Sequence, residues 1–242
     1  MAEREQVLLE HAFVLHQRPY RDSSQLLECM TATHGRVGLV ARGSRGGRNP
    51  QRALLQPFAP LRLSWVRRGE LGRLTHVEPE GSSHALEGHR LLAGFYANEL
   101  LLRLTARSDP NHDAFFCYSR CLAQLAGTAR AARALRVFEL DLLGALGYGL
   151  ELDADSATGE PLRGDASYVY ELEQGLQRVE RADPESDVYS GSDLLSLRGR
   201  ALDDDDSLRT AQRLLGRVLR AHLGERPLKS RLVLQDIVGR GL

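Results

Sequence analysis

The apolar and polar positions of this chain follow a short-strand pattern in its first third. Between residues 9 and 78, short runs rich in apolar, β-branched and aromatic residues alternate with turns that contain Gly, Pro, Asn or Asp. We predict strands at residues 12–17, 24–32, 35–42, 54–68 and 70–78. Short strands joined by tight turns in this number are typical of a small β-barrel.

The pattern changes at residue 84, where apolar residues begin to recur three and four positions apart, as on helices that bury one face. We predict helices at residues 84–106, 113–127, 129–147, 207–224 and 228–239. Residues 150–206 are rich in Gly, Ser and Asp, with one candidate hairpin at 167–179. The chain is therefore expected to be an α+β protein, with a barrel domain in residues 1–80 and a mainly helical domain in residues 81–242.

Charge is distributed unevenly along a chain that has 32 basic and 32 acidic residues and so no formal net charge. Residues 36–73 contain nine arginines and a single acid, Glu70, whereas residues 151–206 contain 16 acids and five arginines. The last part of the chain, from residue 207, is basic again. A local excess of arginine on a small barrel indicates an anionic partner.

Glycine and arginine are concentrated in residues 40–49, VARGSRGGRN, between two predicted strands. No Gly-Lys-Ser/Thr follows, so this is not a phosphate-binding loop of the nucleotide triphosphatases. Five strands with such a hairpin are the form of the oligonucleotide-binding (OB) fold, in which backbone and side chains track a sugar-phosphate strand. Arg42, Arg45, Arg48 and Arg52 would contact phosphates; the alternative is a solvated hairpin that simply carries charge.

The absence of a membrane span, the absence of a signal peptide and the number of cysteines together indicate the cellular compartment. No apolar run is long enough to cross a bilayer, and the polar start MAEREQ differs from a signal peptide. The three cysteines, Cys29, Cys117 and Cys121, are an odd number without the spacing of a disulfide framework. We expect reduced thiols and a cytoplasmic protein.

Several motifs along the chain together resemble the RecO family of bacterial recombination and repair mediators. They are VLHQRPYRDSSQLL, LQPFAPL, YANELL, FELDLLGALGYG and PLKSR, in the order and at the spacing of that family, within residues 11–236. Each motif alone could reflect core packing, so their joint order carries the resemblance. It implies an OB-fold domain followed by a helical region, binding of single- and double-stranded DNA, and annealing of complementary strands.

The resemblance also implies partners. These are RecR and the acidic C-terminal tail of single-stranded DNA-binding protein (SSB), with RecA and RecF engaged indirectly on nucleoid DNA. The sequence has no G-x-S-x-G, H-E-x-x-H or kinase signature, so we expect no enzymatic activity, and we expect neither a cofactor nor a membrane partner. An acidic tail needs an apolar pocket beside a fixed cation. By resemblance we place the tail at Arg133, Leu135, Arg136 and Leu142, although Arg136 could instead cover the core with its alkyl stem.

The candidate DNA-binding residues are the basic residues of the barrel and of the PLKSR motif. They are Arg36, Arg42, Arg45, Arg48, Arg52, Arg67, Arg68, Arg73, Lys229 and Arg231. Lys229 has an alternative role, in which it fixes the last helix against an acidic neighbour. Candidates for base stacking are Tyr20 and Trp65, whereas Phe13 and Phe58 are expected in the core.

The residues that could hold a metal or act in catalysis are expected to have structural roles instead. Many RecO family members have two CxxC pairs for zinc after the GYG turn, where residues 151–176 of this chain have neither Cys nor His, so we expect a zinc-finger-like remnant without metal. His112 with Cys117 and Cys121 lacks a fourth ligand. The acids at 203–206 are expected to cap the helix that follows them. Glu99 and Glu139 are expected to be structural carboxylates bonded to arginine or backbone.

Two other functions remain as alternatives. One is a metal-dependent enzyme acting on nucleic acid, with carboxylates from residues 151–206. The other is an RNA-binding OB protein, because such barrels do not by themselves distinguish DNA from RNA.

Overall fold

The structure is a computed structural model that describes residues 4–44, 51–81, 83–181, 187–224, 226 and 228–230, without the side chains of Gln51 and Arg52. The chain forms two compact units. One contains the residues up to Thr128 together with those from Leu228 on, and the other contains Ala129–Pro227. Among the described residues, no helix has both the length and the apolar character to cross a membrane.

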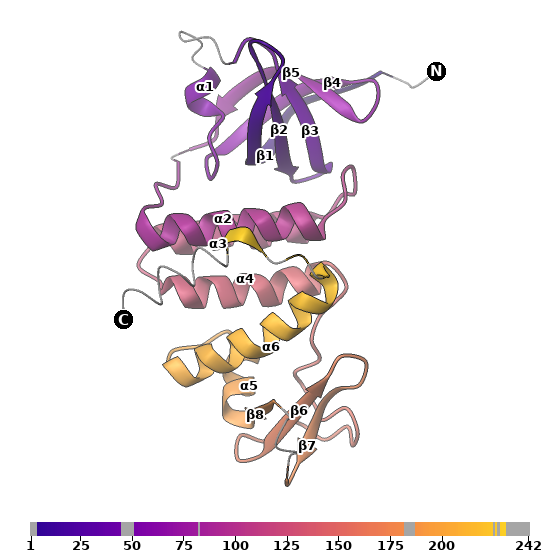
Figure 1. Ribbon diagram of the computed structural model, residues 1–242, viewed down its shortest axis with the longest axis vertical. Coiled ribbons are helices and arrows are strands. Elements are labelled where there is room, and N and C mark those ends of the chain that lie inside the picture. The colour runs from indigo at the N-terminus through magenta and orange to yellow at the C-terminus, as the bar shows by residue number, and fades with distance from the viewer. Residues whose placement is uncertain are drawn as a thin grey trace. The chain divides into compact units, whose positions relative to one another are not determined.

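A closed five-stranded barrel opens the first unit, in the order β1-β2-β3-β5-β4 (Figure 1). Its strands are β1 (Glu5–Tyr20), β2 (Ser24–Thr31), β3 (Gly35–Ala41), β4 (Pro60–Arg67) and β5 (Leu71–Pro79). The β3–β5 pair is parallel and the other four pairs are antiparallel. Alternate residues point inward, and Val14, Leu27, Leu39 and Trp65 are fully buried in the barrel core. The predicted OB-fold barrel is confirmed.

One strand prediction was wrong in its extent. Residues 54–68 were expected to form one strand, but the short helix α1 (Gln51–Leu54) precedes β4, which begins only at Pro60. Phe58 has a φ of 69°, a left-handed conformation that interrupts an extended strand. Its side chain is buried, as is that of Phe13, so both fill the core as expected.

Two helices of the first unit, α2 (Gly88–Leu104) and α3 (His112–Ala126), pack against the barrel. The ring of Phe13 on β1 contacts Phe115 and Tyr118 on α3, with ring centroids 5.5 and 5.2 Å apart. Buried Asn98 on α2 donates a hydrogen bond to the carbonyl oxygen of Leu15 at 2.8 Å and accepts one from the Tyr118 hydroxyl at 2.5 Å. The amide of Asn98 therefore links the barrel to both helices.

The described residues of the second unit form three helices and a small antiparallel sheet of order β7-β6-β8 (Figure 1). Its elements are α4 (Ala131–Ala145), β6 (Ser167–Glu171), β7 (Gly175–Val179), β8 (Val188–Ser190), α5 (Gly191–Arg198) and α6 (Asp205–Leu223). The predicted hairpin at 167–179 is confirmed as β6 and β7, whereas the pattern gave no sign of β8 and α5. Asp204 caps α6 by accepting a hydrogen bond from the Ser207 backbone N–H at 2.8 Å, which confirms the capping role of the acidic run.

Candidate nucleic-acid interface

Four exposed arginines lie on one outer face of the barrel, and we call Arg4, Arg42, Arg68 and Arg73 the arginine face. Strand pairing brings them together, because β5 lies between β3 and β4 and β4 also pairs with β1. Arg73 is opposite Val40 and Val66, and these two residues lie two positions before Arg42 and Arg68 on their own strands. Arg42 directly follows the last residue of β3 and Arg68 the last residue of β4, so both exposed arginines extend from the strands that flank Arg73.

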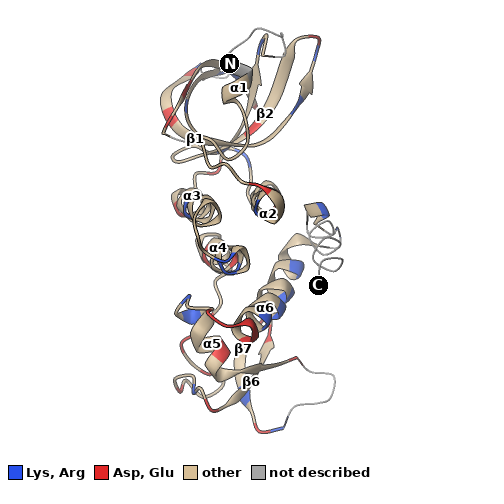
Figure 2. Ribbon diagram, turned by 90° about the vertical axis from the view of Figure 1, so that its left-hand side faces the viewer, with Lys and Arg blue, Asp and Glu red and all other residues tan. Residues whose placement is uncertain are grey.

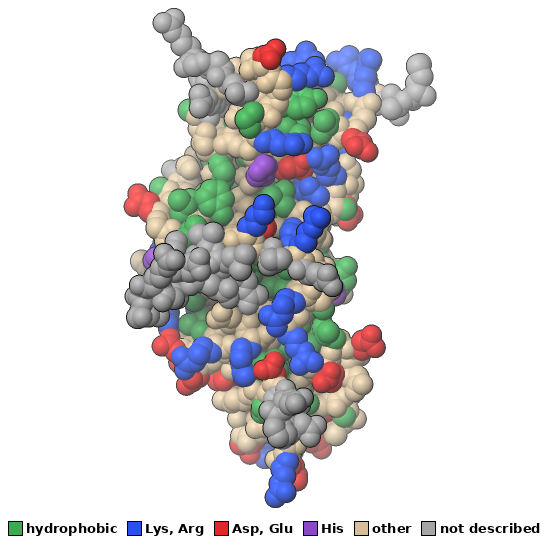
Figure 3. Space-filling view, in the orientation of Figure 1, with side chains coloured by type: hydrophobic (Ala, Val, Ile, Leu, Met, Phe, Trp, Pro, Cys, Tyr) green, Lys and Arg blue, Asp and Glu red, His purple; other side chains and the backbone are tan. Residues whose placement is uncertain are grey.

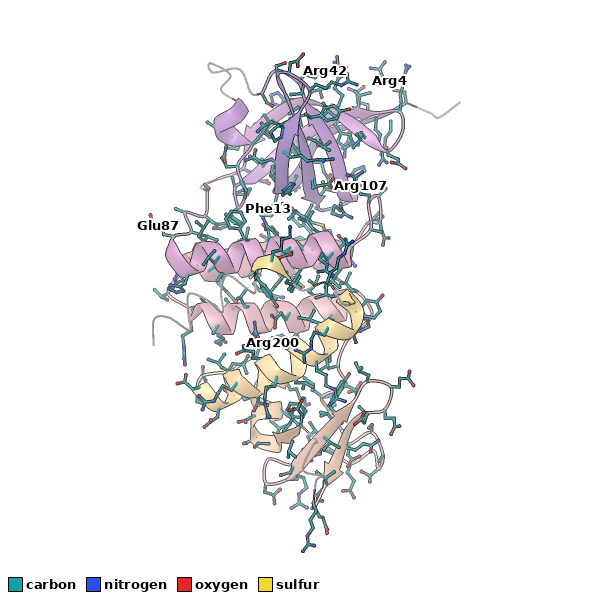
Figure 4. All side chains as sticks on the ribbon, in the orientation of Figure 1. Arg4, Phe13, Arg42, Glu87, Arg107 and Arg200 are labelled. Atoms are coloured by element: carbon teal, nitrogen blue, oxygen red, sulfur yellow. The ribbon has the colours of Figure 1, made fainter. Side chains whose placement is uncertain are left out.

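Arg4 was missed by the sequence analysis. It precedes Glu5, which pairs with Arg67, and this register places Arg4 opposite Arg68 across the β1–β4 pair. Figure 4 shows Arg4 and Arg42 on the same end of the barrel, and basic side chains gather over it in Figure 3. Like charges opposite one another on neighbouring strands destabilise a sheet. Their presence together therefore favours binding of an external anion.

Arg67 has partners within the protein. Its guanidinium donates to a carboxylate oxygen of Glu5 at 2.9 Å and to the Ser108 hydroxyl at 2.6 Å, and its side chain is 22% exposed. The Glu5–Arg67 pair joins β1 to β4, and Ser108 belongs to the loop after α2. Arg67 is thus less available to a phosphate than its neighbour Arg68.

Arg36 lies away from the arginine face, near the start of β3. Its guanidinium donates to Glu28 at 2.8 Å and to the carbonyl oxygen of Thr105 at 2.9 Å, and Glu28 also accepts from Arg107. Gly35 supports the same close approach, because a Cβ on it would lie 1.9 Å from the Asp109 carbonyl oxygen. Arg36 therefore holds the loop after α2 against the barrel, a role that its residue type alone did not reveal.

Of the remaining DNA-binding candidates, the structure describes only Lys229 together with its side chain. Arg45, Arg48 and Arg231 lie outside the described residues, as does the side chain of Arg52. Lys229 is described, and its backbone N–H donates to Glu99 at 3.0 Å. Glu99 is thus the acidic neighbour foreseen in the alternative role of Lys229, although the contact is made by the main chain.

Aromatic side chains offer little for base stacking on the barrel. Trp65 is fully buried, with its ring nearly perpendicular to that of His34, so the expectation that it stacks on a base was wrong. Tyr20 is half-buried at the end of β1, and the guanidinium of Arg21 lies over its ring at 5.3 Å from the centroid. Binding at this surface should therefore depend on charge more than on stacking.

A second row of arginines follows one side of α6, visible as blue segments in Figure 2. Arg209, Arg213, Arg217 and Arg220 are spaced four, four and three residues apart and so share one side of the helix. Arg209 pairs with Asp206, Arg213 lies 3.6 Å from Asp187, and Arg217 lies 3.3 Å from Glu171. Nearby acids partly neutralise this row, whereas none of the arginines of the arginine face forms an ion pair with a described residue.

Comparison with known proteins places the chain in a family. The family model described as Recombination protein O N terminal matches residues 6–82, and the one described as Recombination protein O C terminal matches residues 85–232. The chain belongs to the RecO family.

The sequences of individual relatives match this chain over nearly its full length and over nearly their own full length. A DNA repair protein RecO of Nitrosococcus oceani is 45% identical over 231 residues, which cover 96% of this chain and 94% of that protein. The protein of the same name from Methylococcus capsulatus is 44% identical over 225 residues, 93% of this chain and 92% of its own length. That of Azoarcus is 38% identical over 241 residues, or 98% and 99% of the two chains.

In this RecO family member a carboxylate organises residues 151–176, the segment that we expected to be a zinc-finger-like remnant. Asp155, which is buried, accepts hydrogen bonds from the backbone N–H groups of Ala157 at 2.7 Å, Thr158 at 3.2 Å and Arg178 at 3.0 Å. Burial alone would raise the pKa of Asp155, but these hydrogen bonds outweigh it and hold the pKa below its usual range. The carboxylate thus ties the loop before β6 to strand β7.

Asp155→Asn should lower the free energy of unfolding by about 1–2 kcal/mol, because the amide nitrogen cannot accept the bond from Arg178. A group with a depressed folded-state pKa stabilises the protein above its unfolded-state pKa, and that stabilisation disappears as the pH falls through the folded-state value. The difference between the two proteins should therefore shrink below about pH 4. Urea titrations at pH 7 and at pH 3 measure it. A constant difference between the two pH values would contradict the role of the charge.

The residues predicted to bind the SSB tail either have partners within the protein or are buried. Leu135 and Leu142 are buried within α4, and Arg136 pairs with fully buried Glu139 at 2.7 Å while its own side chain is 13% exposed. Arg133 donates to the carbonyl oxygen of Arg200 at 2.7 Å and to that of Ala201. The expected role of Glu139 as a structural carboxylate bonded to arginine is confirmed.

The other candidate catalytic and metal-binding residues have the contacts expected of structural residues. Glu99 accepts hydrogen bonds from the backbone of Lys229 and Ser230, as expected of a structural carboxylate. Cys29, Cys117 and Cys121 are buried and form no disulfide with a described residue, and burial raises the pKa of Cys29 far above its usual range. Among the described residues, no group of three or more His, Cys, Asp or Glu is placed to hold a metal ion.

Proposed function

We propose that this chain is a DNA-binding recombination mediator in recombinational DNA repair. It binds single- and double-stranded DNA, anneals complementary strands, and with RecR helps to load RecA onto single strands coated with SSB. The observation that supports this most is the arginine face, four exposed arginines on the outer surface of an OB-fold barrel in a member of the RecO family. We assign DNA binding to residues 1–80 and place the protein in the cytoplasm, on the nucleoid.

Annealing follows from charge and requires no bond-making step. Two DNA strands repel through their phosphates, and a protein with two separate basic surfaces screens both while complementary bases pair. The arginine face is one surface, and the arginine row of α6 is the other. We assign the first contacts on the barrel to Arg42, Arg68 and Arg73, because Arg36 and Arg67 have intramolecular ion pairs.

Strand annealing on SSB-coated DNA tests the proposal. Complementary labelled oligonucleotides coated with SSB should anneal faster in the presence of this protein, and SSB without its acidic tail should reduce the gain. Incubation of labelled single-stranded and duplex DNA with magnesium or manganese is the second arm. Cleavage would support the metal-dependent enzyme instead, and tighter binding to RNA than to DNA would support the RNA-binding alternative.

For the SSB tail we retain Arg136 as the principal contact and Arg133 beside it, with Leu135 and Leu142, which are buried, beneath that surface. Arg136→Ala should weaken binding of a tail peptide about 10-fold or more, because a charge-assisted hydrogen bond to a carboxylate is lost. Fluorescence anisotropy with a labelled peptide measures the change. Arg120→Ala, on α3, serves as a control. Unchanged affinity for Arg136→Ala would move the tail site elsewhere.

A further inference from the structure

The outer face of β2 is covered, whereas that of the β3–β5 pair is open. Side chains alternate along β2, and Leu26 and Met30 point away from the barrel core, yet they are only 5% and 0% exposed. Helix α3 packs on β2 and so buries them. On β5, by contrast, Leu71 is 37% exposed and Arg73 is exposed. A ligand of the barrel wall therefore has access to β3 and β5.

This open face combines apolar and basic side chains, and we call Gly38, Val40, Leu71 and Arg73 the β3–β5 strip. The two strands are parallel, with Gly38 opposite Leu71 and Val40 opposite Arg73. Leu39, between Gly38 and Val40, belongs to the barrel core, so the residues on either side of it point outward. Val40 is half-buried. Leu71 and Val40 thus form an apolar floor that solvent can reach.

The side chain of Arg107, from the loop between α2 and α3, extends over the β3–β5 strip. A Cβ on Gly38 would lie 3.2 Å from the guanidinium carbon of Arg107 and 2.7 Å from a methyl carbon of Leu71. Both side chains therefore lie directly on the glycine backbone. Glu28 accepts hydrogen bonds from Arg107 and also from Arg36, so two guanidiniums share one carboxylate. The apolar floor lies between this pair of arginines and Arg73.

We propose that the β3–β5 strip is a contact site for an unpaired nucleic-acid base. Leu71 and Val40 lie under the flat face of the base, and Arg107 and Arg73 contact the phosphates on either side of it. Every base has a π-face that is free to contact protein in a single strand, whereas phosphates are present in single strands and duplexes alike. An apolar floor between two cations therefore fits a single strand better than a duplex.

The charge around the strip suits this occupant. The hydrogen bond to Glu28 raises the pKa of Arg107, and exposed Glu70 adds to the effect, so Arg107 is fully charged. Arg107 and Arg42 lie at opposite ends of the barrel in Figure 4. Two acids near the strip are outnumbered by four arginines, which are Arg36, Arg42, Arg73 and Arg107. This inference rests on the proposed DNA binding and adds to it the place of an unpaired base.

The test compares a single-stranded oligothymidylate with an abasic strand of the same length, which keeps the phosphates and lacks the bases. Leu71→Ser should weaken binding of oligothymidylate about 5-fold, because the apolar floor under the base is lost. Its affinity for the abasic strand should equal that of the wild type. Leu8→Ser is the matched control, since Leu8 is 67% exposed on β1, which pairs with neither β3 nor β5. Fluorescence anisotropy measures all affinities.

A second variant excludes misfolding as the cause of a loss. Leu71→Tyr should strengthen binding of oligothymidylate about 5-fold, because an aromatic ring stacks on a base, and a misfolded protein would not bind more tightly. The proposal is overturned if Leu71→Ser binds oligothymidylate as the wild type does, if it loses equally on the abasic strand, or if Leu71→Tyr brings no gain. These outcomes leave the proposed function intact, whereas a wild type that binds none of the strands would refute both.

Discussion

Replacing Arg42, Arg68 and Arg73 together with glutamate is expected to weaken binding to single-stranded DNA by roughly 100-fold or more at low salt. The three side chains are exposed; Arg73 lies on β5, and Arg42 and Arg68 directly follow the neighbouring strands β3 and β4. Each phosphate contact on a single strand contributes about 0.7 to the slope of log affinity against log salt, so losing three should make that slope about 2 units shallower. Fluorescence anisotropy at several salt concentrations measures both quantities.

A control variant must change the net charge by the same amount as the triple variant, with substitutions at residues outside the barrel. Arg120, Arg178 and Arg181 are exposed on α3, on β7 and just after it, and their replacement by glutamate alters the total charge by the same amount. This control should leave the salt slope near that of the wild type. If both triple variants lower affinity alike while the slopes stay unchanged, the arginine face does not hold the phosphates.

Asn98→Ala is expected to lower the free energy of unfolding by about 3 kcal/mol. The substitution removes two buried hydrogen bonds, to the carbonyl oxygen of Leu15 and from the Tyr118 hydroxyl, and leaves the Leu15 carbonyl without this donor. Buried polar groups that lose their partners keep the full cost of desolvation. Urea unfolding followed by far-ultraviolet circular dichroism measures the change.

Tyr118→Phe provides the comparison, because it removes only the hydroxyl bond and keeps the ring against Phe13. We expect a loss of about 1 kcal/mol. The double variant should cost less than the sum of the two single variants, since both act on one hydrogen bond. A loss below about 0.5 kcal/mol for Asn98→Ala would show that this network contributes little.

Periodicity predicted the barrel and the helices α2, α3, α4 and α6, because each of these elements buries a continuous apolar face. It did not predict β8 and α5, which are short and lie in a polar stretch. The break before β4 was missed for a different reason, since the apolar run of residues 54–68 has the composition of one strand while the left-handed Phe58 divides it.

Charge counting found the basic barrel but could not distinguish arginines with different roles. Arg36 and Arg73 have the same residue type and both lie on strands, yet Glu28 engages Arg36 from the neighbouring strand β2 while Arg73 is exposed. Pairs between residues on different strands depend on the register of the sheet, which the sequence pattern does not give. Arg4 was missed because its neighbours are acidic in sequence, although its cross-strand neighbour is Arg68.

Trp65 is the only tryptophan in the sequence, and it is fully enclosed in the barrel. Among the described residues its indole N–H has no hydrogen-bond partner, and the ring packs in the hydrophobic core of the barrel. Fluorescence excited at a wavelength that tryptophan absorbs and the seven tyrosines do not therefore reports on one location, and its emission should shift to longer wavelength when the barrel opens to water. The protein thus contains its own optical probe of the first unit, with which the melting of that unit can be followed separately from that of residues 129–227.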